Sequence, residues 1–460
     1  MHGPILILYI LGKRFGAFKN NQGFYSQSSK SMLRFFVNHI QSFTQIYDKV
    51  GTFMKILAII AEYNPFHNGH LYHLEQAKAL SSCDYTICIL SSNFIQRGEP
   101  SIISKWARGQ AALQAGIDLV LELPVLYSMS SAEYFAFGSI KILDSLHSVD
   151  AVCFGSESGS LQELESFASF LSEENPLFKE NLKKSLEQGF SYPKAREMAI
   201  MTSSTEKFSS ESFKLSNNIL GIEYLKALRK LNSKILPLTI PRISNQYNTQ
   251  ELSGTISSAT SIRKNIDSPD IISTLPPFSH NLLTQEFSLG RGPVFSSSYA
   301  PMILANLRKM SSHEISQINY VSEGLDYRIK NAAENSGNYI ELLQNISTKR
   351  YPQTRLQRIL FSSLLGILGR DLIQAQNAGG PPYAKVLGFS KKGKEILGSI
   401  AKRSSIPVVT NLKSLEGYSN PLIQRMIEIE KTSSDLYVLG YKNTSFMKAG
   451  QEFSTKLLAP

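Results

Sequence analysis

The sequence predicts an α/β protein with a parallel sheet, followed by a mainly helical C-terminal domain. Over residues 54–272 short apolar runs alternate with helical patterns, and strands that alternate with helices form parallel sheets joined by crossovers. Beyond residue 273, proline-containing segments give way to helical stretches with few strands. We therefore expect one domain over 54–272 and a second over 273–460.

Each expected strand or helix rests on its pattern of apolar residues. Buried strands are expected where short runs are almost wholly apolar, at 55–61, 85–90, 119–123, 151–154 and 235–240. Helices are expected where apolar residues recur every three or four positions, at 71–80, 104–115, 132–146 and 215–231. Because ligands bind beyond the carboxyl ends of parallel strands, the loops after Ala61, Leu90, Phe154 and Ile240 should line the site.

The chain of 460 residues carries a formal charge of +11, and the excess is unevenly distributed. Residues 1–53 hold six Lys and Arg residues and one acid, Asp48. Their short apolar run, 5–11, is followed rather than preceded by basic residues, which makes a poor signal peptide. We expect 1–53 to be a basic extension outside the fold, with Met54 beginning the folded protein. A targeting presequence, which has a similar composition, is the alternative.

The composition excludes several other classes of protein. Hydrophobic residues make up 42% of the chain, which excludes wholesale disorder. The chain has three cysteines, Cys83, Cys88 and Cys153, which are too few for a disulfide scaffold. It contains no CxxC pair, so a structural zinc site is not expected. We interpret them as small core residues of a protein in a reducing compartment, the cytoplasm. No apolar run reaches the length of a membrane span, so no membrane partner is expected.

The most informative motif follows the first expected strand, where the chain reads AEYNPFHNGH at 61–70. An Asn-Pro pair turns the chain, Asn68 is suited to cap a helix, and Gly69 lets a ligand approach the backbone. A helix start offers free N–H groups to phosphate. His67 and His70 project to the same side, where they can donate to phosphate oxygens and stabilise charge that develops as pyrophosphate leaves. Metal ligands or ordinary surface residues are the alternatives, but no carboxylate or cysteine at ligand spacing supports a metal held by side chains.

A second motif, GTISSATSIR at 254–263, places hydroxyl side chains before an arginine. Ser257 or Ser258 can cap a helix here. The side chains that can hold a polyphosphate are those of Thr260, Ser261 and Arg263. Alone this pattern predicts only a capped helix. Together with HxGH about 190 residues upstream it favours a nucleotide site.

The two motifs together resemble those of the HIGH-motif nucleotidyltransferase superfamily. Within it, EYNPFHNGH at 62–70 is similar to one family, the bacterial tRNA(Met) cytidine acetate ligases. Further stretches carry the same resemblance: NFIQRGEP at 93–100, KW at 105–106, DLVLELP at 118–124, FGSE at 154–157 and NNILGIEY at 217–224. It runs from residue 54 to near residue 410, and residues 1–53 lie outside it.

This resemblance implies a fold and an activity. The fold would be a Rossmann-like catalytic domain over 54–272 with a basic tRNA-binding domain over 273–460. The activity would be an ATP-dependent ligation: acetate is activated to acetyl-adenylate, and the acetyl group passes to N4 of the wobble cytidine of elongator tRNA(Met), giving N4-acetylcytidine. ATP would arrive as its Mg²⁺ complex. DNA is not implied as a partner, and the oligomeric state is left open.

The site residues carry over by position. The segment implied to line ATP is Ile60, Ala61, Glu62, Tyr63, Asn64, Pro65, Phe66, His67, Asn68, Gly69, His70, Leu71, Tyr72 and His73. Later parts of the chain add Gly155, one of Asn217 and Asn218, Arg242, Ser257 and Thr260. The implied catalytic groups at the phosphates are His67 and His70, with Arg263 beside them.

The sequence departs from the family at two places. Ser92 stands where a glycine is expected before Asn93, which predicts a stiffer loop. SNQYN at 244–248 replaces an expected stretch with glycine and histidine. We therefore expect the surroundings of Arg242 to differ in detail while the fold is retained.

The loop over 91–104 faces the expected site because it follows the second strand. Arg97 is its cation and Glu99 its acid, and Lys105 directly follows it. Our hypothesis is that Arg97 or Lys105 acts in catalysis by offsetting charge on the substrate carboxylate or on the α-phosphate; a solvated charge pair is the alternative. Trp106 is interpreted as a core or helix-face residue rather than a stacking platform.

A basic segment over 345–405 holds eleven Lys and Arg residues against two acids, with Tyr351, Tyr383 and Phe389 interleaved. Clustered cations with aromatic residues suit an RNA backbone and splayed bases, whereas a solvated helix face is the alternative. The candidate tRNA-binding residues are Lys349, Arg350, Arg355, Arg358, Lys385, Lys391 and Lys392.

Two other functions fit part of the sequence. A small-molecule nucleotidyltransferase that makes a dinucleotide-type product would not need the basic segment. A non-catalytic RNA-binding protein would not need the intact residues of the two motifs, which are His67, Gly69, His70, Ser257, Thr260 and Arg263. ATP–pyrophosphate exchange with and without acetate, followed by acetyl transfer to tRNA, separates the three functions.

Overall fold

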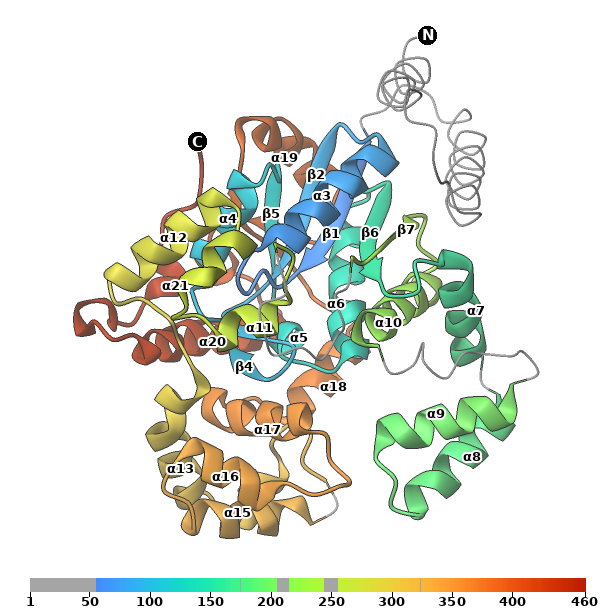
Figure 1. The fold of residues 1–460 in the computed structure, drawn as a ribbon, viewed down its shortest axis with the longest axis vertical. Coiled ribbons are helices and arrows are strands. Elements are labelled where there is room, and N and C mark those ends of the chain that lie inside the picture. Colours follow the sequence, from blue (N-terminus) through green and yellow to red (C-terminus); the bar gives the residue numbers. More distant parts are fainter. Residues whose placement is uncertain (1–54, 174, 205–214, 244–254, 323) are drawn as a thin grey trace, which may run out of the picture. The chain divides into compact units, whose positions relative to one another are not determined.

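A seven-stranded sheet organises the part of the chain described by the computed structural model, residues 55–173, 175–204, 215–243, 255–322 and 324–460 (Figure 1). The expected extension over 1–53 and the departure at 244–248 lie outside the described residues. The strands are β1 (Ile56–Ala61), β2 (Tyr85–Ser91), β5 (Leu119–Leu123), β6 (Ala151–Ser156), β7 (Leu236–Pro241), β8 (Ala384–Phe389) and β9 (Val408–Val409), in the order β7-β6-β1-β2-β5-β8-β9.

The five strands expected from the sequence pair in parallel. The chain moves outward from β1 to β2 and β5, and then returns to the other side of β1 to form β6 and β7. The order therefore reverses between β1 and β6. In open parallel sheets ligands bind at the carboxyl ends of the strands beside such a reversal, so the fold directs attention to the loops after β1 and β6.

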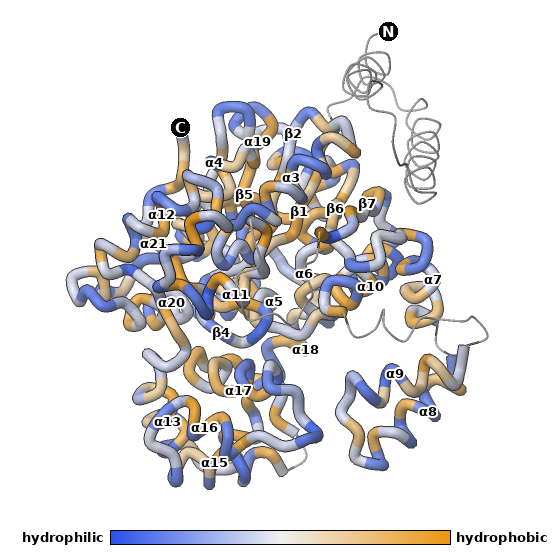
Figure 2. The backbone as a smooth tube through the Cα atoms, viewed as in Figure 1, coloured by the Kyte–Doolittle hydropathy of each residue, from blue (hydrophilic) through white to orange (hydrophobic). Residues whose placement is uncertain are grey.

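The helices between these strands cover both faces of the sheet. Because the crossovers are right-handed, α3 (Asn68–Ser81) and α4 (Lys105–Gln114) lie on one face, whereas α6 (Ala132–Ser145) and α10 (Ser216–Lys230) lie on the other. Gly221 lets α10 approach β6 closely, since a Cβ there would lie 2.7 Å from Cε2 of Phe154. Figure 2 shows hydrophobic residues along the central strands, where Leu57, Ile87 and Leu121 are fully buried.

The remaining elements before residue 272 are short or stand between β6 and β7. A small hairpin of β3 (Phe94–Ile95) and β4 (Glu99–Pro100) follows β2, and α5 (Val125–Ser128) follows β5. Between β6 and β7 the chain adds α7 (Leu161–Ser172), α8 (Pro176–Glu187) and α9 (Tyr192–Ser203), and a 2.8 Å ion pair from Arg196 to Glu223 joins α9 to α10. The segment α11 (Ala259–Lys264) follows β7.

The C-terminal part is mainly helical but also extends the sheet. Its helices are α12 (Pro277–Ser288), α13 (Ala300–Lys309), α14 (Ser312–Ser316), α15 (Leu325–Glu334), α16 (Tyr339–Ile346), α17 (Gln353–Leu365), α18 (Gly369–Asn377), α19 (Lys391–Arg403), α20 (Pro421–Tyr437) and α21 (Gln451–Ser454). β8 pairs antiparallel with β5, and β9 pairs parallel with β8. The sheet is thus mostly parallel, it continues past the expected boundary at 272, and 55–460 is one compact unit.

Candidate active site

The HxGH motif forms the start of α3, at the carboxyl end of β1. His67 is the residue that caps the helix: its Nδ1 accepts from the backbone N–H of Gly69 at 3.0 Å. Its own backbone N–H donates to Nδ1 of His70 at 3.3 Å. The expectation that Asn68 caps the helix was therefore wrong, because a histidine nitrogen one position earlier takes that role.

These contacts fix what the two histidines can offer a ligand. Because Nδ1 is the acceptor in both rings, the neutral tautomer carries its proton on Nε2 in each. The rings stack with centroids 3.7 Å apart and an interplanar angle of 25°. His67 and His70 thus hold two N–H donors side by side at a helix start, which is an arrangement suited to phosphate oxygens.

Burial keeps this group of histidines uncharged. Burial, with smaller contributions from the nearby charges of Arg242 and Arg263, lowers the pKa of His67 to about 3. The pKa of His70 falls well below its usual value for the same reason, with added repulsion from His67 and Arg242. Burial and Arg242 also lower the pKa of His73 to about 4. At neutral pH the three rings are therefore neutral hydrogen-bonding groups beside arginine cations.

The second motif lies against the first, as the pairing of the two predicted. Nδ2 of Asn68 donates to the backbone oxygens of Thr255 (2.8 Å) and Ser273 (2.9 Å). Arg263 donates to the backbone oxygen of Asn64 at 2.8 Å. Ser258, one of the two candidates, caps α11 by accepting from the N–H of Ser261.

Within the second motif, the side chains of Arg263 and Thr260 form a hydrogen bond with each other. Arg263 donates to Oγ1 of Thr260 at 3.4 Å, and burial lowers its pKa. Ser257 is buried. The buried Nδ2 of Asn64 has no hydrogen-bond partner among the described residues and is available to a ligand.

The carboxyl ends of β6 and β7 bring together the later candidate residues. Glu157 accepts from Nδ2 of Asn217 at 2.6 Å and from the backbone N–H of Asn218 at 2.9 Å. Oδ1 of Asn217 accepts from Arg242 at 2.8 Å. A Cβ at Gly155 would lie 3.3 Å from Cγ of Arg242, so the absence of a side chain there makes room for that arginine.

Asn217 and Asn218 hold different positions in this network. Asn218 is buried, its Oδ1 accepts from the N–H groups of Glu157 and Ser158, and its Nδ2 has no partner among the described residues. Asn217 is half-buried and links Glu157 to Arg242. Glu157 was not predicted as a site residue, although its position directly after the strand β6 was a signal for one.

The loop after β2 is anchored to the HxGH loop. Oε1 of Glu62 accepts from the backbone N–H of Gln96 at 2.9 Å. Arg108, which is fully buried, donates to the backbone oxygens of Glu62 and Ser92, both at 2.6 Å. Arg97 is half-buried and close enough to Glu62 to lower its pKa, although burial outweighs this and raises the pKa of Glu62 overall.

Arg108 is a residue that sequence reasoning missed. It joins the loops that follow β1 and β2, so it positions both sides of the candidate site. Its location on an expected helix gave no sign of burial; a cation three residues after Lys105, on the same helix face, was the only signal.

The side chain of Ser92, expected to stiffen its loop, donates to Glu430 at 3.3 Å.

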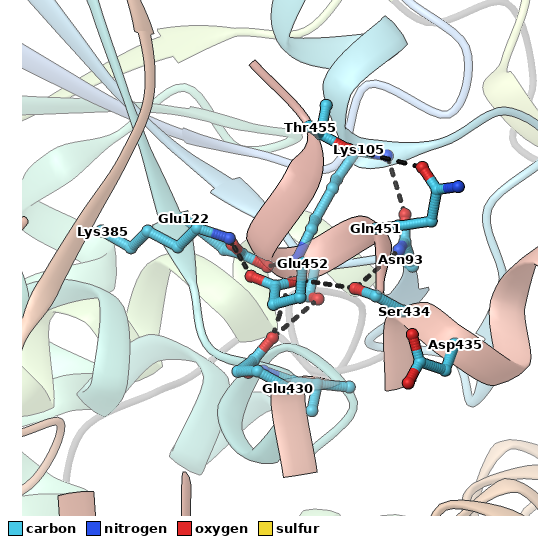
Figure 3. Close-up of polar contacts among 12 residues, drawn as sticks. Asn93, Lys105, Glu122, Lys385, Glu430, Ser434, Asp435, Gln451, Glu452 and Thr455 are labelled. Atoms are coloured by element: carbon cyan, nitrogen blue, oxygen red, sulfur yellow. Dashed lines mark hydrogen bonds and ion pairs between the residues drawn. The ribbon is translucent and has the colours of Figure 1, made fainter. Parts of the chain in front are cut away.

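Lys105 does not face the candidate site as expected, because it points into a buried cluster of charges (Figure 3). Its Nζ lies 2.5 Å from Glu122 and 2.7 Å from Glu452. Lys385 enters the same cluster, 3.0 Å from Glu122 and in an ion pair with Glu452. Both lysines are almost fully buried, so neither Lys105 as a catalytic cation nor Lys385 as a tRNA contact fits the structure.

The charged groups of this cluster shift one another's pKa values. Burial tends to raise the pKa of Glu122, but Lys105 and Lys385 overcome it and hold that pKa below its usual range. Burial and the charge of Glu122 raise the pKa of Glu430 well above its usual value. Glu122, Glu430 and Glu452 are close enough to share a metal ion, but the two ammonium groups already occupy that position.

Trp106 and the cysteines are where the sequence predicts them. Trp106 is half-buried on α4 and covers the charge cluster, with its ring 5.0 Å from Nζ of Lys105. Cys88 and Cys153 are buried in strands, and Cys83 is half-buried; all three are free thiols. Burial raises the pKa of Cys88 to about 12, which leaves it an unreactive core residue.

The predicted basic segment divides between two edges of the sheet. Lys349 and Arg350 are exposed and precede α17, which packs on the β3–β4 hairpin at the carboxyl edge. Lys391 and Lys392 are exposed on α19 at the opposite, amino edge, where Lys392 donates to the backbone oxygen of Asp84, just before β2.

Two further arginines of the segment are used inside the fold. Arg355 donates to the backbone oxygen of Tyr320 and to Oγ of Ser322. Arg358 is buried and donates to the backbone oxygen of Gln96 at 3.0 Å. The expectation that Arg358 contacts tRNA does not fit this burial, because α17 packs this part of its surface on the β3–β4 hairpin.

The reversed strand order, the paired histidines at a helix start and the adjoining 255–263 segment together define a nucleotidyltransferase of the HIGH type. The family model described as HIGH Nucleotidyl Transferase matches residues 54–452. A tRNA(Met) cytidine acetate ligase of Acetivibrio thermocellus is 49% identical over 88% of this chain and 100% of its own length. The enzyme of that name from Caldanaerobacter subterraneus subsp. tengcongensis is 44% identical over 86% of this chain and 98% of its own.

Solved structures agree with these relatives. Thermotoga maritima TmcAL bound with alpha-thio ATP is similar with a TM-score of 0.82 at 35% identity, over 88% of this chain and 99% of that one. Its apo form gives a TM-score of 0.84 over the same shares. The chain belongs to the HIGH nucleotidyltransferases and, within them, to the tRNA(Met) cytidine acetate ligase family. It is therefore an enzyme, a ligase. Over the described residues, the helices are too short or too polar to cross a bilayer.

Proposed function

We propose that the protein activates acetate with ATP to acetyl-adenylate and then acetylates N4 of the wobble cytidine of elongator tRNA(Met). The observation that carries this proposal is the pair of neutral histidines at the start of α3, braced by the second motif through Asn68 and Arg263. The relatives named as tRNA(Met) cytidine acetate ligases and the solved relative bound with alpha-thio ATP support the choice of substrates.

In the first step, an oxygen of acetate attacks the α-phosphorus of ATP. The new oxygen–phosphorus bond replaces the bond to the β-phosphate, and pyrophosphate leaves. Nε2–H of His67 and His70 and the start of α3 stabilise the negative charge that builds up on the phosphates. Arg97, in the loop after β2 and close to Glu62, offsets charge on the acetate carboxylate or the α-phosphate.

In the second step, N4 of cytidine attacks the acetyl carbonyl of the mixed anhydride. A carbon–nitrogen bond forms, the carbon–oxygen bond to AMP breaks, and N4 releases one proton. No covalent intermediate with the protein is required. The thiols agree with this, because Cys88 and Cys153 are buried in strands and cannot act as nucleophiles.

ATP lies, in this proposal, along 60–73 with its phosphates at His67 and His70. Gly155, Arg242 and the asparagines at 217 and 218 border it from the ends of β6 and β7. The buried Nδ2 atoms of Asn64 and Asn218, which have no partner among the described residues, are two further donors for the nucleotide.

Mg²⁺ is expected to arrive on the triphosphate rather than in a protein cage. The carboxylates next to the candidate site are already used: Glu62 accepts from Gln96, and Glu157 accepts from Asn217 and Asn218. These residues therefore do not fit a metal site built from side chains, and phosphate oxygens would supply the ligands.

The free thiols and the tRNA substrate favour the cytoplasm as the place of action.

Acetate-dependent ATP–pyrophosphate exchange tests the first step. The purified protein is given ATP, labelled pyrophosphate and either acetate or no acid. We expect exchange only with acetate, because the adenylate must form before pyrophosphate can return. Exchange that is equally fast without acetate would overturn the proposal and favour a different nucleotidyl transfer.

A further inference from the structure

A hollow of about 530 Å³ opens between α15 and α16, in the helical region far along the chain from the ATP motifs. Apart from Ala332, the residues that line it have polar or aromatic side chains. The lining residues are Tyr327, Arg328, Asn331, Ala332, Asn335 and Asn345. No acidic side chain lines it. Its volume is within the range of sites that hold a small ligand.

The three asparagines present unused hydrogen-bonding atoms to this hollow. Asn331 and Asn335, four residues apart on one face of α15, are joined by a 2.7 Å bond from Nδ2 of Asn335 to Oδ1 of Asn331. Nδ2 of Asn345 donates to Ser336 at 2.9 Å. All three asparagines are exposed, and the described residues bond neither Nδ2 of Asn331 nor the amide oxygens of Asn335 and Asn345. One donor and two acceptors thus remain.

An aromatic residue and cations border the same hollow. Tyr327 stands one turn before Asn331 and is 71% exposed, so the face of its ring is open to a stacking partner. Arg328 donates to the backbone oxygens of Ile346 and Ser347, at 2.7 and 2.9 Å. These bonds hold Arg328 against residues 346–347, which come just before the exposed Lys349 and Arg350 in the chain.

We propose that this hollow binds one unstacked nucleobase of the RNA substrate. Tyr327 stacks on the face of the base, the amides of Asn331, Asn335 and Asn345 bond its edge, and Lys349 and Arg350, beside the backbone that Arg328 holds, meet the flanking phosphates. Protein sites for single-stranded RNA combine these same elements: an aromatic platform, amide contacts to base edges and neighbouring cations. The inference rests on the proposed function, since it supplies a subsite for the tRNA that function requires.

The test is tRNA binding by the full-length protein as a function of salt. Tyr327→Ala should raise the Kd for tRNA(Met) about tenfold, or about 1.4 kcal/mol, without changing the slope of affinity against salt concentration, because no charge is removed. Tyr327→Trp should bind like the wild type. Tyr418→Ala, which removes another exposed tyrosine outside the hollow, is the matched control and should also bind like the wild type.

A second measurement reads the base directly. Chemical probing of the Watson–Crick edges in bound tRNA should find one base that wild-type protein protects and that Asn331→Ala leaves reactive. Acetate-dependent exchange should be unchanged in Tyr327→Ala and Asn331→Ala, which also shows that both variants are folded. If both variants bind tRNA within twofold of wild type and protect the same bases, the base site is overturned while the proposed function stands. If wild-type protein itself fails to bind or acetylate tRNA, the proposed function fails instead.

Discussion

At the scale of single residues, the site depends on groups that burial has made neutral or fixed in direction. His67 and His70 present donors because their Nδ1 atoms accept hydrogen bonds within the helix start. The HxGH spacing predicted that both rings lie on one side, and they do. The spacing could not predict which residue caps the helix, because histidine is not among the usual capping residues.

Arg97 provides the sharpest residue-scale test of the acetate site. Arg97→Ala should lower the rate of acetate-dependent ATP–pyrophosphate exchange about a hundredfold, the typical effect of removing one charge-stabilising group. Arg229→Ala removes an exposed arginine that donates to Ser169 on a different helix and should exchange at the wild-type rate. Exchange within threefold of wild type in Arg97→Ala would leave this side chain as a solvated charge.

The buried histidines predict how stability depends on pH. The pKa of His67 is about 3 in the folded protein and about 6.5 in an unfolded chain. Between these values the unfolded chain binds one more proton, so His67 stabilises the fold above pH 6.5 and loses about 1.4 kcal/mol of that stability per pH unit as the pH falls toward 3. Urea unfolding at a series of pH values measures this slope.

His67→Gln removes this titration while its amide oxygen can still accept from Gly69. The variant should therefore lose less stability between pH 6 and pH 4 than wild type. Above pH 7 the two slopes should agree, because the histidine is neutral in both states there. Equal slopes in the acid range would mean that the ring is protonated in the folded protein.

At the scale of secondary-structure elements, the sequence predicted the five strands β1, β2, β5, β6 and β7 and the four helices α3, α4, α6 and α10 to within a few residues. Continuous apolar runs and amphipathic periodicity are local signals, and here local and tertiary preferences agree. β8 escaped prediction because its partner, β5, lies more than 250 residues earlier, and a short strand joined over that distance has no local signature.

The two edges of the sheet separate the candidate RNA contacts. Lys349 and Arg350 lie at the carboxyl edge with the candidate ATP site, whereas Lys391 and Lys392 lie at the amino edge. Lys349→Gln with Arg350→Gln should weaken tRNA binding and reduce the slope of log affinity against log salt by about two, one for each lost phosphate contact.

Lys391→Gln with Lys392→Gln is the matched pair, with the same change of charge on the other edge. We expect it to reduce acetyl transfer less than the first pair does, because its edge faces away from the site of the adenylate. A larger loss from the amino-edge pair would place the RNA path across α19 instead. Arg355 and Arg358 are unsuitable for such a test, because both side chains hold backbone oxygens within the fold.

At the scale of the whole molecule, the catalytic and helical parts share one sheet and one buried charge cluster. Glu122 comes from β5, Lys105 from α4, Lys385 from β8, Glu430 from α20 and Glu452 from α21. The sequence placed Lys105 in a loop facing the site, and no local pattern could show that carboxylates more than 300 residues away would meet it. The cluster ties the C-terminal end of the described chain to the catalytic sheet.

Removing one partner of this cluster should therefore destabilise the whole protein. Lys105→Met leaves buried carboxylates uncompensated and should lower the free energy of unfolding by about 3–5 kcal/mol. Lys105→Met combined with Glu452→Gln should recover part of this loss, because one negative charge is removed as well. Denaturant unfolding measures both variants. A Lys105→Met protein with wild-type stability and no exchange activity would instead support a catalytic role for this lysine.

In the proposed reaction a single site makes acetyl-adenylate, and the acetyl group then passes to tRNA. Both steps are tested together by incubating the protein with labelled acetate, ATP and elongator tRNA(Met) and identifying the nucleosides by mass spectrometry after digestion. We expect one labelled N4-acetylcytidine per tRNA, at the wobble position, formed only when ATP is present. Labelled acetyl-adenylate without labelled tRNA, or label at another nucleoside, would contradict it.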